Sequence, residues 1–275
     1  MSARPNGWQD GRKLVALDID GTVLHEDGVI SDPVSAEVRR LADAGHEVML
    51  ATGRSVASTL PVVEQLKISP EYVVCCNGAI TLRRDPMAPH GYRRQFVETF
   101  DPTHVLTTVR THLSGGRYAV EDETGFYRYT GDFPKGALGH SSERVDFDKL
   151  LHTRATRVVV ISPDHGVEEF LGIVERMGLH RVSYTVGWTA WLDIAPDGVN
   201  KATALERVRE ALGAPRRSLV AVGDGRNDIE MLRWAGEAGR GVAMGQAPAD
   251  VREAATELTT SVAEDGLQKV LSTIP

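Results

Sequence analysis

The chain has 275 residues, of which 41% are hydrophobic and 25% are charged, the composition of an ordinary soluble globular protein. Its formal net charge of -7 argues against a general nucleic-acid-binding surface, because such surfaces are basic. The two cysteines, Cys75 and Cys76, are adjacent and build no disulfide framework, and no apolar run approaches the roughly 20 residues that span a bilayer. We therefore expect a cytoplasmic protein that binds neither nucleic acid nor membrane, with both cysteines buried in a strand.

The first part of the chain predicts strands that alternate with amphipathic helices. Residues 13–19, KLVALDI, form a short apolar run typical of a strand buried on both faces of a parallel sheet. A helix is expected at 31–44, with Asp32-Pro33 as its cap and first-turn proline and Gly45 as its stop. Strands at 46–51 and 72–76 then flank a helix at 56–66. This alternation indicates βαβ units and a parallel sheet.

The middle of the chain predicts a different unit. Residues 83–94, RRDPMAPHGYRR, are polar, contain two prolines and are typical of a linker. Helices are expected beyond it at 102–113 and 166–177, and strands at 117–121, 126–129, 156–161, 182–186 and 190–194, while no element is predicted for 131–151. Short links between these strands favour a mixed or antiparallel sheet.

The alternation of strands and helices then returns. A helix is expected at 201–212, a strand at 218–222, a helix at 228–235 and a short strand at 241–243. We therefore predict an α/β fold with a Rossmann-like parallel-sheet core, residues 1–82 and 189–275. An inserted α+β domain, residues 83–188, interrupts this core.

Polar clusters that contain glycine stand where four predicted core strands end. They are DIDGT at 18–22, TGR at 52–54, NGA at 77–79 and GDGRND at 223–228. The carboxyl ends of parallel strands line up along one edge of an open sheet, and ligands bind there. The sequence therefore predicts that the four clusters meet in one cleft.

The acidic residues of these clusters predict a metal site. Asp18 and Asp20 would meet Asp224 and Asp228, and carboxylates packed together need a cation or a proton. Oxygen ligands without histidine or cysteine favour Mg²⁺. Lys201 and one Mg²⁺ would still leave excess negative charge beside a phosphate, so we expect one protonated carboxyl, with Asp20 as the candidate general acid.

These motifs resemble those of the haloacid dehalogenase (HAD) superfamily, and in more detail its Cof-type branch with a type-IIB cap. The resemblance rests on DIDGT, TGR, Lys201 within APDGVNK, and GDGRND, in the right order along the chain. NGA, VAMGQA at 242–247 and EDGL at 264–267 add to it. It covers both core segments and reaches residues 83–188 only by size and position. It implies that the inserted domain is a cap that closes over the cleft and selects the leaving group.

The resemblance implies a phosphatase acting on a small phosphorylated metabolite: a sugar phosphate, a nucleotide or a cofactor phosphate. Asp18 would attack phosphorus to form an aspartyl-phosphate, while Asp20 would protonate the leaving oxygen and then activate water. Mg²⁺ would be held by the Asp18 carboxylate, the Asp20 backbone carbonyl and Asp224. Asp228 would support the metal directly or through water.

Further roles follow from the same resemblance. Thr52, the Gly53 backbone and Lys201 would bind the phosphoryl oxygens, and Asn227 would orient the phosphate or Lys201. Arg54 stays open between a contact to substrate or cap and an ion pair that holds its loop. Trp188 and Trp191, at the predicted junction of cap and core, are expected to pack in the core, with an aromatic contact to substrate as the alternative.

Two alternatives remain beside the phosphatase. A phosphosugar mutase of the same superfamily would share the core and cap type, but nothing in residues 83–188 demands a retained bisphosphate. A non-catalytic ligand-binding protein on the same core would be expected to have lost some of the acids. Asp18, Asp20 and Asp224 are all present.

Overall fold

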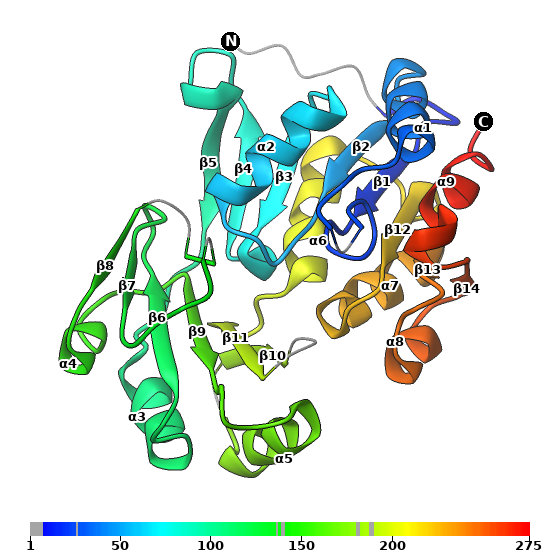
Figure 1. The fold of residues 1–275 in the computed structure, drawn as a ribbon. Coiled ribbons are helices and arrows are strands. Elements are labelled where there is room, and N and C mark those ends of the chain that lie inside the picture. The colour runs from blue at the N-terminus through cyan, green and yellow to red at the C-terminus, as the bar shows by residue number, and fades with distance from the viewer. Residues whose placement is uncertain (1–7, 26, 136, 139–140, 180–181, 187–189) are drawn as a thin grey trace.

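The computed structural model describes every residue except 1–7, 26, 136, 139–140, 180–181 and 187–189. In the upper part of Figure 1 a parallel sheet is flanked by helices, and a second sheet with its own helices lies below it. Among the described residues, no helix has the length and apolarity needed to cross a bilayer.

The upper sheet is parallel throughout, which confirms the predicted α/β class. Its strand order is β14-β13-β12-β1-β2. Every neighbouring pair in it runs in the same direction. The strands are β1 (Leu14–Leu17), β2 (Glu47–Leu50), β12 (Leu219–Gly223), β13 (Arg240–Ala243) and β14 (Glu257–Leu258).

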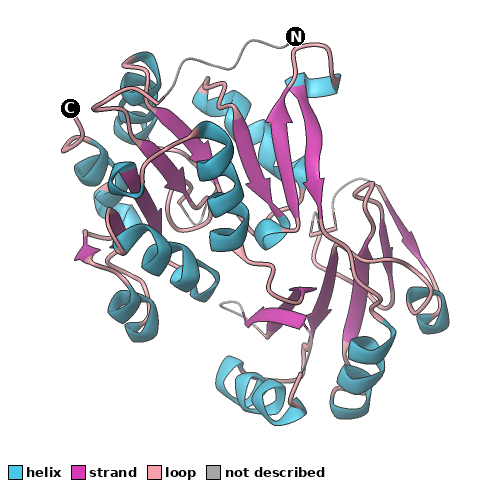
Figure 2. Ribbon diagram, turned by 180° about the vertical axis from the view of Figure 1, so that it is seen from behind, coloured by secondary structure: helices cyan, strands magenta, loops and turns pink. Residues whose placement is uncertain are grey.

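Both faces of this sheet are buried. Alternate residues of a strand point to opposite sides of the sheet, and in β1 the residues of both sides lie in apolar clusters. Val15 and Leu17 belong to one apolar cluster, and Leu14 and Ala16 to another. Figure 2 shows helices on both sides of the sheet. The first cluster includes residues of α1 (Asp32–Asp43), α2 (Val56–Leu66) and α9 (Gly266–Leu271), and the second includes residues of α6 (Lys201–Leu212), α7 (Ile229–Gly236) and α8 (Ala249–Ala254).

Two local predictions need correction. The cap of α1 is Ser31, whose side chain accepts a hydrogen bond from the Val34 amide, so Asp32 lies inside the first turn. Cys75 and Cys76 are both buried, but only Cys75 lies in a strand. Cys76 begins the short 3₁₀ turn η1 (Cys76–Gly78) with a φ of 52°, a left-handed conformation that ends the strand.

The prediction of a linker at 83–94 is wrong, because the chain forms a β-hairpin there. β4 (Ile80–Arg84) and β5 (Tyr92–Val97) pair antiparallel with each other, and β4 pairs with β3 (Tyr72–Cys75). Leu82 faces the core, whereas Arg83 and Arg93 lie outside in ion pairs with Glu71 and Asp85. An isolated bridge between Ala51 and Val74 joins this hairpin sheet to the edge of the parallel sheet.

The second sheet has six strands in the order β10-β11-β9-β6-β7-β8. All of its pairs are antiparallel except β7 with β8, so of the two predicted options, mixed or antiparallel, the sheet is mixed. Apolar residues of α3 (Thr103–His112) and α5 (Val167–Met177) pack on one of its faces. The strands are β6 (Arg117–Glu121), β7 (Tyr127–Tyr129), β8 (Ser142–Arg144), β9 (Arg157–Ile161), β10 (Val182–Val186) and β11 (Trp191–Pro196), and α4 (Phe147–Leu150) follows β8.

The division into core and inserted domain stays a prediction, and strand pairing suggests where to draw it. β4 and β5 belong to the sheet of β3, whereas β11 pairs with β9 in the six-stranded sheet. The predicted boundary at residues 188 and 189 falls outside the described residues. We propose that the chain passes from one unit to the other after β5 and returns after β11.

Candidate active site

The predicted site residues lie around one cavity at the carboxyl ends of the parallel strands. Its volume of ≈ 530 Å³ is that of a pocket for a small molecule. Asp18 follows β1, Thr52 lies just beyond β2, and Asp224 follows β12. Of the predicted residues, Asp18, Asp20, Thr52, Gly53, Arg54, Asp224 and Asn227 line the cavity, whereas Lys201 and Asp228 lie behind the lining.

Lys201 is a fully buried cation between two aspartates. Its Nζ donates to Oδ1 of Asp18 at 2.6 Å and to Oδ1 of Asp228 at 2.7 Å. Asn200 caps α6 through a reciprocal pair of bonds with Thr203, which fixes Lys201 at the first helical position. Burial alone would lower the pKa of Lys201, but Asp18 and Asp228 more than reverse this and raise it, so Lys201 stays charged.

Asp228 holds the loop that carries Asp224. Its Oδ2 accepts hydrogen bonds from the backbone N–H groups of Asp224 at 3.0 Å and Gly225 at 2.9 Å. Both of its oxygens therefore already have donors, which favours a positioning role for Asp228 over direct contact with a metal. A side chain at Gly223 would collide with the Asp228 carboxylate, so glycine is required where the loop folds back.

The buried carboxylates form an acidic cluster with too little positive charge. Carboxylate oxygens of Asp18, Asp224 and Asp228 lie within 4.8 Å of one another. Burial, and next the charge of Asp228, raise the pKa of Asp18 well above its ordinary value. The same two causes raise the pKa of Asp224 to about 7. A divalent cation with oxygen ligands relieves such repulsion, so the residues fit Mg²⁺.

Gln246 is a site residue that the sequence analysis did not single out. Its Nε2 donates to the Gly21 carbonyl at 2.6 Å and to Oδ2 of Asp224 at 3.0 Å. Gly21 has a φ of 73°, and a side chain there would collide with the Asp224 carboxylate. The signal in the sequence was the VAMGQA segment, which supported the family resemblance but predicted no role for this residue.

Arg54 forms the ion pair that was one of its two predicted roles. Its Nη2 lies 2.5 Å from Oδ1 of Asp20 and its Nε 2.9 Å from Oδ2, a two-pronged contact. The Arg54 amide also donates to Oγ1 of Thr52 at 3.1 Å. The Asp20 side chain is 61% exposed and lies apart from the buried cluster. Both carboxylate oxygens of Asp20 are therefore engaged by Arg54 in this arrangement.

Asn227 hydrogen-bonds Asn77, in the turn after β3, rather than Lys201. Its Nδ2 donates to Oδ1 of Asn77 at 3.0 Å, and the Asn77 amide donates to the Thr52 carbonyl. A Cβ at Gly53 would lie 3.1 Å from Oδ1 of Asn77, so glycine lets this side chain approach the loop. Three strand ends are thereby joined into one wall.

The six-stranded sheet supplies lining residues, of which only Trp191 was singled out in the sequence. Arg157 from β9 and Trp191 and Asp193 from β11 face the cavity. Trp191 thus lies where its alternative role, an aromatic contact to substrate, requires it, and Trp188 falls outside the described residues. Among the lining residues that the structure describes, each arginine pairs with a carboxylate: Arg54 with Asp20, Arg157 with Asp193, and Arg226 with Asp250.

Comparison with known proteins points to one family. The family model described as haloacid dehalogenase-like hydrolase matches residues 15–271. The chain is 28% identical over 269 residues to the 5-amino-6-(5-phospho-D-ribitylamino)uracil phosphatase YitU of Bacillus subtilis, covering 94% of this chain and 96% of the relative. It is 27% identical over 254 residues to the pyridoxal phosphate phosphatase YbhA of Escherichia coli, covering 86% of this chain and 88% of the relative.

Solved structures share the whole fold. The subclass IIB sugar phosphatase BT4131 superposes with a TM-score of 0.79 at 21% identity, over 95% of this chain and 98% of that chain, a likeness of fold alone. A protein of Geobacillus kaustophilus superposes with a TM-score of 0.71 at 28% identity, over 96% and 98% of the two chains. Both likenesses extend over the parallel sheet and the six-stranded sheet together.

Proposed function

The chain belongs to the haloacid dehalogenase-like hydrolase family, and from this premise we propose that it is a Mg²⁺-dependent phosphatase of small phosphorylated metabolites that acts through an aspartyl-phosphate. The observation that carries the proposal is the buried contact of Asp18 with Lys201, beside Asp224 and Asp228, at the edge of the parallel sheet. A nucleophile, a fixed cation and a set of oxygen ligands are brought together there by distant parts of the chain.

Asp18 is the proposed nucleophile. Lys201 holds its Oδ1, which leaves Oδ2 to attack phosphorus. A bond forms between this oxygen and phosphorus while the bond from phosphorus to the leaving oxygen breaks. Water then attacks the phosphorus of the aspartyl-phosphate, which releases inorganic phosphate and restores Asp18.

Asp20 is the proposed general acid and base. It would donate a proton to the leaving oxygen in the first step and take one from the attacking water in the second. Because Arg54 engages both oxygens of Asp20 in this arrangement, we expect Arg54 to shift when an ester enters the cavity. A phosphate group offers the guanidinium alternative acceptors of the same geometry.

The proposed ligands of Mg²⁺ are the Asp18 carboxylate, the Asp20 backbone carbonyl and Asp224, with Asp228 as support. When bound, Mg²⁺ neutralises charge on the carboxylates and on the transferring phosphoryl oxygens. Thr52, the Gly53 backbone and Lys201 would bind those oxygens, and Asn227 would hold the wall beside them. Arginines alone would replace Mg²⁺ poorly in neutralising this charge, because the arginines among the described lining residues already pair with carboxylates.

The substrate is proposed to be a phosphate monoester of a small metabolite. Two relatives are named for phosphate esters of small ring compounds, a ribitylaminouracil and pyridoxal. The cavity of ≈ 530 Å³ suits compounds of that size. Nucleic acid and membranes are not expected partners, and a cytoplasmic location remains our expectation.

Phosphate release tests the proposal directly. Wild type and Asp18→Asn are assayed on p-nitrophenyl phosphate and a panel of phosphorylated metabolites, each with Mg²⁺ or EDTA. We expect release that requires Mg²⁺ and is lost in Asp18→Asn. Release that persists in EDTA would remove the metal assignment, and release by Asp18→Asn would remove the aspartyl-phosphate.

A further inference from the structure

One wall of the catalytic cavity comes from the six-stranded sheet. Arg157 on β9 and Trp191 and Asp193 on β11 line the same cavity as Asp18 and Asp20. Trp191 and Asp193 are two residues apart and therefore point to the same face of their strand. β9 pairs with β11, so Arg157 stands beside them on the neighbouring strand.

The Asp193 carboxylate fixes the other two side chains. Its Oδ1 accepts from Nε of Arg157 at 2.6 Å, and its Oδ2 accepts from Nε1 of Trp191 at 3.2 Å. The Trp191 ring also meets the Phe133 ring edge to face, with centroids 6.4 Å apart at 86°. A flat guanidinium and an indole are thereby held in set orientations before any ligand binds.

Arg157 keeps donors free toward the cavity. It is 8% exposed, and its Nη1 donates to the Tyr127 hydroxyl at 3.3 Å. In the part of the chain that the structure describes, its Nη2 makes no hydrogen bond. A ligand group that reaches this wall opposite Asp18 therefore meets N–H donors of a buried arginine.

The charge of Arg157 is already balanced. Asp193 pairs with its Nε, and Oε2 of the fully buried Glu121 lies 3.9 Å from its Nη1. A second phosphate bound here would have to displace Asp193 or lie beside its carboxylate. The wall therefore suits a neutral group that accepts hydrogen bonds, and it disfavours the bisphosphate that a phosphosugar mutase must hold.

We propose that Arg157, Trp191 and Asp193 form the leaving-group subsite, which selects phosphate esters whose leaving group carries an uncharged flat ring with hydrogen-bond acceptors. The inference rests on the proposed phosphatase function and deepens it. The indole offers a surface on which a ring stacks. The guanidinium donates to carbonyl oxygens or ring nitrogens at the edge of that ring.

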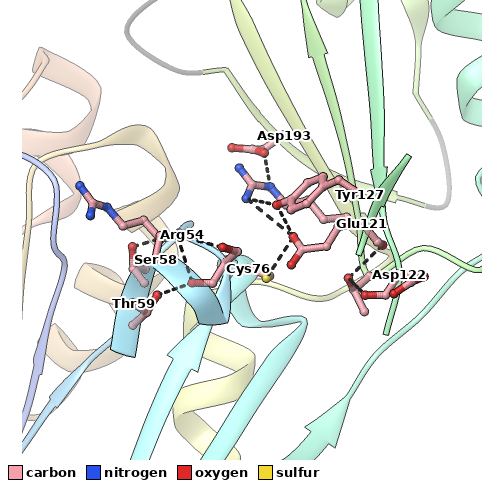
Figure 3. A network of polar contacts seen from close by, with 12 residues as sticks. Arg54, Ser58, Thr59, Cys76, Glu121, Asp122, Tyr127 and Asp193 are labelled. Atoms are coloured by element: carbon pink, nitrogen blue, oxygen red, sulfur yellow. Dashed lines mark hydrogen bonds and ion pairs between the residues drawn. The ribbon is translucent and has the colours of Figure 1, made fainter. Parts of the chain in front are cut away.

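This subsite is tied to the catalytic loop of the parallel-sheet unit. Cys76 Sγ donates to Oε2 of Glu121 at 3.6 Å, and the Cys76 amide donates to the Arg54 carbonyl at 2.9 Å. Figure 3 shows Cys76 between Arg54 on one side and Glu121 with Tyr127 on the other. Arg157 is therefore joined to the Arg54 backbone through Glu121 and Cys76.

Matched esters test the subsite in the full-length protein with Mg²⁺. Uridine 5′-monophosphate and ribose 5-phosphate share a phosphorylated ribose and differ by the uracil ring. We expect wild type to favour the uridine ester in kcat/KM. Arg157→Lys and Trp191→Leu should each lower the ratio of the two kcat/KM values by about tenfold, mainly through KM of the uridine ester. Arg154→Lys, an exposed arginine that bonds Thr99, is the control and should leave the ratio unchanged.

Asp193→Asn gives a test by gain of function. It removes the charge that balances Arg157, so it should raise kcat/KM for fructose 1,6-bisphosphate relative to fructose 6-phosphate by about tenfold. Thermal melts identify any variant that fails to fold, in which case the remaining variants decide. Ratios within twofold of wild type in the folded variants would overturn the subsite, as would a wild type that prefers ribose 5-phosphate.

Binding separates failure of the subsite from failure of the phosphatase. Calorimetry on Asp18→Asn should give about tenfold tighter binding of uridine 5′-monophosphate than of ribose 5-phosphate, and Arg157→Lys in the same background should remove the difference. Equal affinities would overturn the subsite. Wild type that binds both esters but releases phosphate from neither would instead overturn the phosphatase.

Discussion

The Nζ of Lys201 lies 2.6 Å from Oδ1 of Asp18, although the two residues are 183 positions apart in the chain. The contact forms only when α6 returns to the edge of the parallel sheet where β1 ends. Lys201 lies between Asp18 and Asp228, which would otherwise repel each other in a buried site. One side chain thus joins two buried carboxylates from distant parts of the chain.

Lys201→Met should therefore destabilise the protein as well as inactivate it. Removing the cation leaves two buried carboxylates unpaired, and breaking a buried ion pair in this way costs about 3–5 kcal/mol. Denaturant unfolding measures the loss. Lys269→Met, at an exposed lysine of α9, is the matched control and should change stability by less than about 0.5 kcal/mol. Equal stability of the two variants would contradict the structural role of Lys201.

Asp18→Asn should separate chemistry from folding. The amide keeps the shape of the side chain but cannot attack phosphorus, so we expect turnover to fall by about 10³-fold or more. Stability without metal should stay equal or rise, because burial raises the pKa of Asp18 and its charge is unfavourable there. Circular dichroism and phosphate release measure the two effects. Asp43→Asn, at an exposed position of α1, should change neither.

The strand ends explain why so much of this site was predictable. Asp18, Thr52 and Asp224 each follow a short apolar strand, and parallel strands bring their carboxyl ends to one edge whatever the loops do. The pairing of Arg54 with Asp20 was not predictable beyond one of two options. It depends on how two loops from different strands face each other.

Apart from Trp191, for which substrate contact was one of two roles, the leaving-group wall could not be found from the sequence. Arg157, Trp191 and Asp193 lie in ordinary strand segments, and their common orientation depends on the register of β9 against β11. The hairpin of β4 and β5 was missed for a related reason. Its arginines gave the segment the composition of a polar linker. In the structure, Glu71 and Asp85 pair with Arg83 and Arg93, and the sequence does not indicate these ion pairs.

Stability without metal should fall as pH rises from about 4 to about 7. Burial and the charge of Asp228 raise the pKa of Asp224 from its ordinary 3.8 to about 7. Between these values the folded state holds a proton that the unfolded state has lost, and this advantage disappears as pH passes the folded pKa. A tenfold difference in proton affinity between the folded and unfolded states contributes about 1.4 kcal/mol to the free energy of unfolding.

Mg²⁺ should reverse this trend, because it replaces the proton as the partner of the carboxylates. Thermal unfolding at pH 5, 6, 7 and 8, in EDTA and with Mg²⁺, measures both effects. We expect the stabilisation by Mg²⁺ to grow with pH and to be weaker in Asp224→Asn. A stability in EDTA that is flat from pH 5 to pH 8 would contradict the raised pKa of Asp224.

Asp20→Asn should slow esters according to how badly their leaving oxygen needs a proton. An alkoxide leaves poorly without protonation, so kcat/KM for an alkyl phosphate such as ribose 5-phosphate should fall by about 10²- to 10⁴-fold. The p-nitrophenolate ion leaves without help, so kcat/KM for p-nitrophenyl phosphate should fall far less. kcat/KM is the right quantity because it reports transfer to Asp18 and not the later hydrolysis, in which Asp20 is also expected to act.

A substitution of Arg54 provides a second comparison for the test of Asp20 as proton donor. Arg54 holds both oxygens of Asp20, so Arg54→Lys weakens the clamp while Asp20 keeps its carboxyl. If Asp20 delivers the proton, Arg54→Lys should lower kcat/KM for both esters by a similar factor, and only Asp20→Asn should separate them. An equal loss for both esters in Asp20→Asn would assign Asp20 to binding and leave the proton to another group.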